Sequence, residues 1–274
     1  MKRFFLPCTP PFLNFYTLRK TTHMTHAIGK MANQIYETTK NDCSIYLYGS
    51  VTLDDFREGW SDIDIIALTG HKMSDDEENT LVYLRQKMMK DNPIYRSFEG
   101  VILPLADLIS ETPSRAVYWG TSGQKITDAF TADPFLMKQL TTSARLLIGN
   151  DIRAGLREPS YNELVDAVSS HLDCVRNHAS ATGHPLYSYG WLLDISRCIW
   201  TLRTGEIISK TQAGEWALEN HLCPDETALK YALRARKAPL AAKNAPGLMQ
   251  VAGMIAPAIQ TYADVLEAEL KKAK

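Results

Sequence analysis

Apolar runs in the first half of the chain predict strands on either side of a polar loop. Residues 45–48 and 63–68 are rich in isoleucine, leucine and tyrosine, as buried strands are. A helix is expected at about 74–90, where Ser74 precedes acidic residues that favour the first turn. Residues 95–103 return to a strand-like pattern, so the predicted order is strand, strand, helix, strand.

The pattern is less regular in the next fifty residues. Residues 110–123 combine serine, threonine, proline and glycine, which is typical of turns. Asp133 followed by Pro134 predicts the start of a helix, and residues 146–149 predict a last short strand. A domain boundary is expected near residues 150–159.

From residue 161 onward, apolar residues recur every three or four positions, as on the buried face of a helix. Leu164, Val168 and Leu172 show this spacing. The second half therefore reads as a bundle of amphipathic helices. The predicted helices lie at about 161–179, 186–204, 210–220, 226–237 and 247–272.

Asp62 and Asp64 are the first candidates for chemistry, because alternate residues of a strand project from one face. Two carboxylates at one spot repel each other unless a cation lies between them, and a few oxygen ligands suit magnesium. Upstream, Gly49 would let the backbone approach a phosphate, and Ser50 would offer its hydroxyl and amide. An isolated Asp-x-Asp is also common in ordinary strands and turns, but the Gly-Ser pair favours a nucleotide site.

Glu99 is the candidate for a third carboxylate. The predicted order of elements returns its strand beside the aspartates, where it could position or deprotonate an attacking hydroxyl. Spacing alone equally allows an edge-strand residue that faces water.

Composition narrows the class of protein without identifying it. The 274 residues allow two domains, and 30 basic against 31 acidic residues leave no broad basic surface for nucleic acid. Five cysteines without paired or metal-binding spacing argue against a disulfide framework. No segment approaches the roughly 20 apolar residues that span a bilayer. We therefore expect a cytoplasmic protein with neither nucleic acid nor membrane as a partner.

The first 23 residues differ from the rest of the chain. Lys2 and Arg3 before an apolar stretch imitate a signal peptide, but Pro7 and Pro10 interrupt that stretch. We expect residues 1–23 to be an extension outside the fold.

Several motifs together resemble a known family. Gly49-Ser50 followed by Ser61-Asp62-Ile63-Asp64 resembles the nucleotidyltransferase superfamily. Residues 199–210, IWTLRTGEIISK, and residues 215–219, EWALE, narrow the resemblance to the aminoglycoside nucleotidyltransferases that adenylylate streptomycin and spectinomycin. The resemblance runs from about Met24 to the C-terminus.

This resemblance implies a fold and a set of site residues. The fold is an α/β (α+β) nucleotidyltransferase domain with a mixed sheet at 24–155, followed by an all-α helical-bundle domain at 156–274. ATP is the implied co-substrate, and two Mg²⁺ ions are implied at Asp62, Asp64 and Glu99, with Glu99 as general base. The implied nucleotide-binding residues are Gly49, Ser50, Ser61, Asp133 and Lys210.

For some of these residues a purely structural role remains an alternative. Asp133 also fits a plain helix cap. Lys210 follows Ser209, a residue type that caps helices, and also fits a solvated lysine at a helix start. Trp200 and Trp216 are expected in the core. Arg236 and Lys237 read most simply as a solvated basic face.

The acceptor is expected to bind between the two domains. Residues 183–191, GHPLYSYGW, contain no Asp or Glu; His184 and Ser188 stand where the family's streptomycin enzymes carry aspartates, and Trp191 where they carry an asparagine. Trp119 is a further candidate contact, with packing as the alternative. These departures favour spectinomycin over streptomycin.

The expected function is adenylylation of an aminoglycoside or aminocyclitol by a monomeric enzyme, which would confer antibiotic resistance. Two alternatives remain, a protein adenylyltransferase and a nucleotide-binding module without catalysis.

Overall fold

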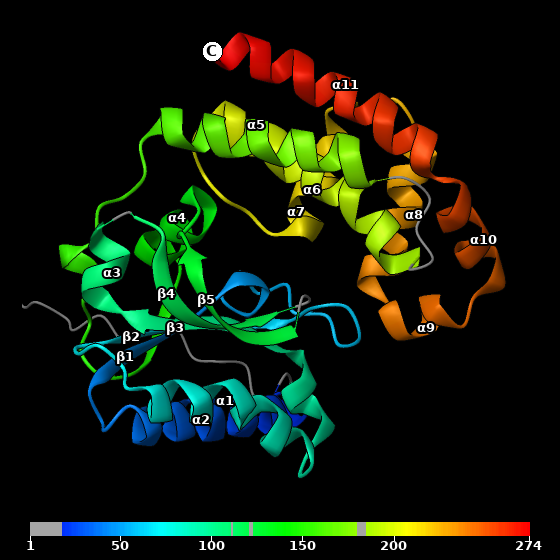
Figure 1. The fold of residues 1–274 in the computed structure, drawn as a ribbon. Helices are drawn as coiled ribbons and strands as arrows, with labels where there is room; N and C mark the ends of the chain where they lie inside the picture. The colour runs from blue at the N-terminus through cyan, green and yellow to red at the C-terminus, as the bar shows by residue number, and fades with distance from the viewer. Residues whose placement is uncertain (1–17, 111, 121–122, 180–184) are drawn as a thin grey trace, which may run out of the picture.

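A six-stranded sheet forms the centre of the first half of the chain. The computed structural model describes residues 18–110, 112–120, 123–179 and 185–274, and Figure 1 shows the sheet below a set of helices from the second half. The strands are β1 (Cys43–Tyr48), β2 (Ile63–Thr69), β3 (Phe98–Pro104), β4 (Ser114–Gly120), β5 (Gly123–Phe130) and β6 (Arg145–Ile148).

The sheet is mixed, as predicted. Its spatial order is β5-β4-β3-β2-β1-β6, with β2 and β3 parallel and every other neighbouring pair antiparallel. The crossover from β2 to β3 runs through α2 (Asp75–Met89), which is the predicted order of strand, strand, helix, strand. Ser74 caps α2 in a capping box with Glu77.

The prediction of turns over residues 110–123 was wrong. Residues 114–120, half of that stretch, form β4, which pairs with β5 so that Trp119 lies opposite Gln124 and Gly120 opposite Gly123. The β-branched and aromatic residues of β4 fit a pleated, half-buried surface, and this preference outweighs the flanking turn residues.

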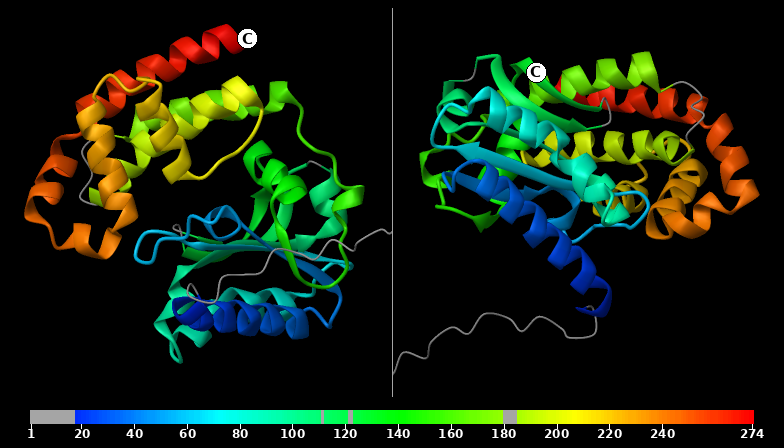
Figure 2. Two further views of the ribbon diagram at one scale, coloured as in Figure 1. Left: turned by 180° about the vertical axis from the view of Figure 1, so that it is seen from behind. Right: turned by 60° about the horizontal axis from the view of Figure 1, so that its bottom comes forward.

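Helices cover both faces of the sheet. The helices α1 (Leu18–Thr38) and α2 pack on one face, and α3 (Leu105–Ser110) and α4 (Pro134–Thr142) pack on the other (Figure 2). Ile63 and Ile65 are fully buried in the core under α1 and α2, whereas Ile66 and Leu68 lie in the core under α4. Because strand residues alternate between faces, Asp62 and Asp64 share the face of Ile66 and α4.

The N-terminal helix differs from the expected start of the fold. The helix α1 begins at Leu18 and therefore crosses the boundary that we expected at Met24. From Ala27 onward it contributes Ile28, Met31 and Ile35 to the core. Residues 1–17 lie outside the described residues, so their position relative to the fold stays a prediction.

The second half is helical, as predicted. Its helices are α5 (Tyr161–His178), α6 (Pro185–Thr204), α7 (Lys210–Glu219), α8 (Glu226–Lys237), α9 (Pro239–Lys243), α10 (Pro246–Met254) and α11 (Ala256–Ala273). Short 3₁₀ turns occur at Gly49–Val51, Pro93–Ser97 and Arg153–Gly155.

The single helix predicted at 247–272 is divided into α10 and α11. Pro257, in the first turn of α11, has no N–H to donate to the preceding turn and its ring would clash with a continuing helix, so the first helix ends at Met254. Trp200 and Trp216, which we expected in the core, are both half-buried: their rings meet edge to face at 5.2 Å, and Trp216 packs against the helical core.

A buried ion pair joins the sheet-bearing half to the helical half. Arg236 of α8 is 2 % exposed, and its Nη2 donates to a carboxylate oxygen of Asp55 at 3.0 Å and to the Asp55 carbonyl at 2.9 Å. Thr211 of α7 donates its hydroxyl to the same carboxylate at 2.6 Å. The prediction of a solvated Arg236 was therefore wrong. The domain division between residues 155 and 156 stays a prediction.

Candidate active site

Three polar side chains lie in a row across neighbouring strands. Asp64 of β2 is in register with Tyr48 of β1 on one side and with Glu99 of β3 on the other. Asp62 lies two residues before Asp64 and therefore projects from the same face. Since Val101 and Leu103 lie in the core under α4, Glu99 also projects from this face.

The turn after β1 fits closely against Asp64. Gly49 has a φ of +72°, in the left-handed region, and a Cβ placed on it would lie only 2.0 Å from Oδ2 of Asp64. The backbone N–H of Ser50 donates to the Asp64 carboxylate, and the Ser50 hydroxyl donates to the Asp62 carbonyl at 3.3 Å. Only glycine allows the backbone and this carboxylate to come so close.

The carboxylates strongly perturb one another. Burial and then the charge of Asp62 raise the pKa of Asp64 to about 7. Burial and then the charges of Asp62 and Asp64 raise the pKa of Glu99 to about 7, against a smaller opposing effect of Arg85. Burial also raises the pKa of Asp62, although nearby Lys210 partly offsets it. The site thus concentrates more negative charge than the protein alone compensates.

A cavity of about 370 Å³ opens in front of Asp62 and Asp64, between the sheet and the helical half. Helix α6 forms much of its roof, with Tyr187, Trp191 and Asp194 at the i, i+4 and i+7 spacing of a single helix face. The other lining residues are Tyr48, Ser50, Leu53, Asp55, Trp60, Ser61, Gln139, Gly190, Arg197, Ser209, Lys210 and Arg236.

Two cations and one carboxylate face the aspartates from the roof. Lys210 is the first residue of α7, capped by Ser209, and its Nζ lies 3.0 Å from Oδ2 of Asp194. Arg197 lies 3.5 Å from the other oxygen of Asp194. Burial acts to raise the pKa of Asp194, but Lys210 and then Arg197 outweigh it and lower that pKa below its usual value.

The structure brings most of the predicted nucleotide-site residues together. Ser50, Ser61 and Lys210 line the cavity with the two aspartates, and Gly49 supports Asp64 from behind. Ser61 accepts the backbone N–H of Arg57 at 2.9 Å, which orders the loop before Asp62.

Glu99 and Asp133 lie at the margin of this group. Glu99 is the strand neighbour of Asp64 but does not line the cavity. Asp133 is exposed and accepts the N–H of Leu136 at 2.8 Å, as a cap of α4 does. The charge of Asp133 nevertheless contributes, after burial and the charge of Asp64, to the raised pKa of Tyr48, so Asp133 lies near Tyr48 and Asp64.

The residues predicted to bind the acceptor differ in where the structure places them. Trp191 lines the cavity, whereas Ser188 is buried and does not line it. Trp119 is fully buried, and its indole N–H donates to the carbonyl of Leu81 at 2.9 Å, so its assignment as an acceptor contact is corrected to packing. His184 lies outside the described residues.

The residues present fit a magnesium site in their chemistry. Within the described ranges, no three His, Cys, Asp or Glu side chains form a ready metal-binding cluster. However, Asp62, Asp64 and Glu99 all offer carboxylate oxygens, and the pKa values of Asp64 and Glu99 are raised by burial and then by neighbouring negative charge, which a divalent cation would neutralise.

Sequence reasoning missed two groups of residues around the cavity. Tyr187, Asp194 and Arg197 could have been found from their helical spacing with Trp191 on an otherwise apolar helix. The Arg236 ion pair had no local signal, because its partner lies 181 residues earlier in the chain.

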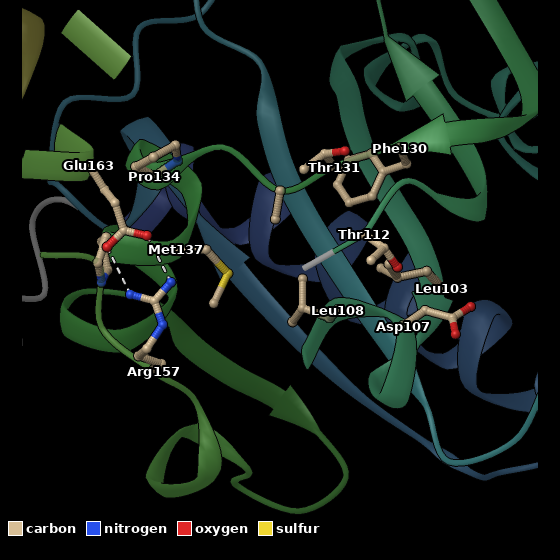
Figure 3. Close-up of a pocket in the computed structure, with 12 residues that line it drawn as sticks. Leu103, Asp107, Leu108, Thr112, Phe130, Thr131, Pro134, Met137, Arg157 and Glu163 are labelled. Atoms are coloured by element: carbon tan, nitrogen blue, oxygen red, sulfur yellow. Dashed lines mark hydrogen bonds and ion pairs between the residues drawn. The ribbon is translucent and has the colours of Figure 1, made fainter. Parts of the chain in front are cut away.

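A second cavity lies at the other end of the sheet and is shown in Figure 3. It has a volume of about 210 Å³ and apolar walls from α3, α4 and β5. Arg157 and Glu163 close one side with an ion pair of 2.8 Å. None of the predicted site residues lines it, so the larger cavity is the candidate active site.

Among the residues that the structure describes, no helix is long and apolar enough to cross a membrane.

Comparison with known proteins gives a family match and a structural match. Residues 156–255 match the family described as aminoglycoside adenylyltransferase, C-terminal domain. The structure resembles the spectinomycin adenyltransferase AAD(9) from Enterococcus faecialis, solved with ATP and spectinomycin, with a TM-score of 0.66 over 89 % of this chain and 99 % of that one. The two sequences are 16 % identical, so this likeness establishes the fold. A search of curated proteins finds no match.

The two comparisons cover different parts of the chain. The family match covers the helical region that roofs the cavity, and the shared fold covers the sheet that carries the carboxylates. Residues 156–255 match the C-terminal domain of the aminoglycoside adenylyltransferases, and the chain as a whole shares the fold of the spectinomycin adenyltransferase.

Proposed function

We propose that this protein transfers AMP from ATP to a hydroxyl of an aminocyclitol antibiotic, with magnesium as cofactor and spectinomycin favoured over streptomycin. The observation that supports it most directly is the single cavity where Asp62 and Asp64 of the sheet face Lys210 and Arg197 of the helical half. Carboxylates opposite cations suit a metal-bound polyphosphate, whose charge both groups can bind.

The nucleotide would lie across this cavity with its phosphates near the turn after β1. Ser50 and Ser61 would hold phosphate oxygens, and Lys210 and Arg197 would stabilise charge on the departing pyrophosphate. The resident cations would be held by Asp62, Asp64 and Glu99 and would offset the charge that builds up on the transferred group.

Glu99 would accept the proton of the attacking hydroxyl. Cations bound beside it would favour its ionised form, which is the form that a general base requires. The hydroxyl oxygen would form a bond to the α-phosphorus in line with the leaving oxygen, and pyrophosphate would depart with its electron pair. Trp191 and Tyr187 would bound the acceptor from α6.

Two observations support spectinomycin as the acceptor. The structurally similar adenyltransferase was solved with spectinomycin, and residues 183–191 of this chain contain no acidic residue. Since ATP is the co-substrate, the reaction belongs in the cytoplasm, and the small acceptor requires neither nucleic acid nor a second copy of the chain.

The test is to incubate the purified protein with magnesium, ATP labelled in its α-phosphate, and a panel containing spectinomycin, streptomycin and other aminocyclitols. We expect label on spectinomycin and release of pyrophosphate. Label on protein would instead support a protein adenylyltransferase. ATP binding without transfer would support a nucleotide-binding module, and either outcome would overturn the proposal.

A further inference from the structure

Asp194 supplies an acidic group on the helix that forms the roof of the cavity, where the segment just before it has none. Residues 183–191 carry no Asp or Glu, and Asp194 is the next acidic residue along α6. It lies on the cavity face of that helix, one turn beyond Trp191. Its side chain is 20 % exposed, so it is accessible from the cavity.

The Asp194 carboxylate forms ion pairs with two cations that also face the nucleotide site. Nζ of Lys210 lies 3.0 Å from one oxygen, and Nη1 of Arg197 lies 3.5 Å from the other. Lys210 also acts on Asp62 and Asp64, lowering the pKa of each against other effects. Lys210 therefore lies between two acidic groups, Asp194 on one side and Asp62 with Asp64 on the other. It cannot direct all of its N–H donors to either group.

A triphosphate changes this balance. A polyphosphate attracts both cations and competes with Asp194 for their N–H donors. A partly buried carboxylate that loses its partners is unfavourable until another cation replaces them. Asp194 would then carry its charge toward the space where the acceptor binds.

The net charge of the cavity wall also favours a cationic acceptor. The wall contains the acidic residues Asp55, Asp62, Asp64 and Asp194, four in number, against three basic residues, Arg197, Lys210 and Arg236. ATP with one Mg²⁺ still carries negative charge and with two it is about neutral, so the acidic wall leaves the remaining space favourable for a positively charged molecule. Aminocyclitols carry protonated amines near neutral pH and meet this requirement.

We propose that Asp194 determines specificity for a cationic acceptor: its carboxylate binds a protonated amine of the acceptor once Lys210 and Arg197 turn to the triphosphate. This inference rests on the proposed adenylyl transfer, and it assigns to α6 the acidic contact that residues 183–191 lack.

The test compares Asp194→Asn with wild type and with Asp264→Asn. Asp264 pairs with Arg176 at 2.6 Å outside the cavity, so its variant also removes one carboxylate from one ion pair. In Asp194→Asn we expect the spectinomycin Kd, measured with a nonhydrolysable magnesium nucleotide bound, to rise about 10- to 100-fold. The Kd for the magnesium nucleotide alone should stay equal or fall, because a competitor for Lys210 is gone. Asp264→Asn should change neither Kd.

Two further measurements separate recognition from structural damage. Asp194→Glu keeps the charge and should recover part of the spectinomycin affinity, while thermal melting shows whether each variant is folded. If Asp194→Asn instead weakens nucleotide binding, Asp194 serves to position Lys210 and the inference is wrong. An unchanged spectinomycin Kd would also overturn it. If wild type binds nucleotide but modifies no aminocyclitol, the proposed function fails as well.

Discussion

Replacing Gly49 with alanine tests the contact between the turn after β1 and Asp64. The added Cβ would lie 2.0 Å from Oδ2 of Asp64, whereas ordinary contacts begin near 3.4 Å. The carboxylate must therefore shift by about 1.4 Å. A misplacement of this size in a reacting group costs about 100-fold in rate. The left-handed φ of +72° adds about 1–2 kcal/mol of backbone strain.

Gly123→Ala is the matched control for that experiment. Gly123 has a φ of +98°, but a Cβ placed on it meets nothing within 4 Å. Urea denaturation should therefore show a loss of about 1–2 kcal/mol in Gly123→Ala and at least as much in Gly49→Ala. Pyrophosphate release should fall about 100-fold in Gly49→Ala alone. Normal turnover in a folded Gly49→Ala protein would refute the claim that Asp64 is held in place for the reaction.

Three further predictions concern charge and packing. Glu99→Gln should lower kcat about 100- to 10,000-fold and leave nucleotide affinity within about threefold; normal turnover would show that Glu99 is wrongly assigned as base. Because the pKa values of Asp64 and Glu99 are about 7 when folded but near 4 when unfolded, the folded protein retains protons that the unfolded chain releases. Without divalent cation, the free energy of unfolding should therefore fall as the pH rises from about 4 to about 7. The urea midpoint should fall less over this range in Asp64→Asn than in wild type. Equal falls in the two proteins would show that Asp64 is not the source of the pH dependence. Arg236→Met should cost up to about 3–5 kcal/mol by calorimetry, because it removes the buried cation of the Asp55 carboxylate and leaves only the partly exposed Arg57, whose Nε lies 3.1 Å from the other oxygen; a loss below about 1 kcal/mol would argue that the remaining partners are sufficient.

Local patterns in the sequence were sufficient for the elements that carry the carboxylates. Alternation in β2 placed Ile63 in one core and Asp64 on the other face, and the strand, strand, helix, strand order brought Glu99 beside Asp64. Ser209 as a cap located Lys210 at the start of α7. These features depend on contacts between residues close in sequence or on a short parallel crossover.

Features that depend on distant contacts were not predictable in this way. Trp119 could be a ligand contact or a core residue until the position of α2 was known, since its indole partner Leu81 lies 38 residues earlier. Arg236 looked solvated because its helix has a basic end, and only the docking of α8 on the loop around Asp55 buries it. Tertiary packing decided both cases.

The most direct test of the account is the stoichiometry of transfer with and without the central carboxylate. Wild type and Asp64→Asn should be mixed with α-labelled ATP, magnesium and spectinomycin, and the antibiotic separated and weighed by mass spectrometry. Asp128→Asn, which removes an exposed carboxylate of β5, serves as the control. We predict one AMP on each modified spectinomycin and one pyrophosphate released in wild type and control, and no product in folded Asp64→Asn. Adenylylated spectinomycin formed at the wild-type rate by Asp64→Asn would contradict the account.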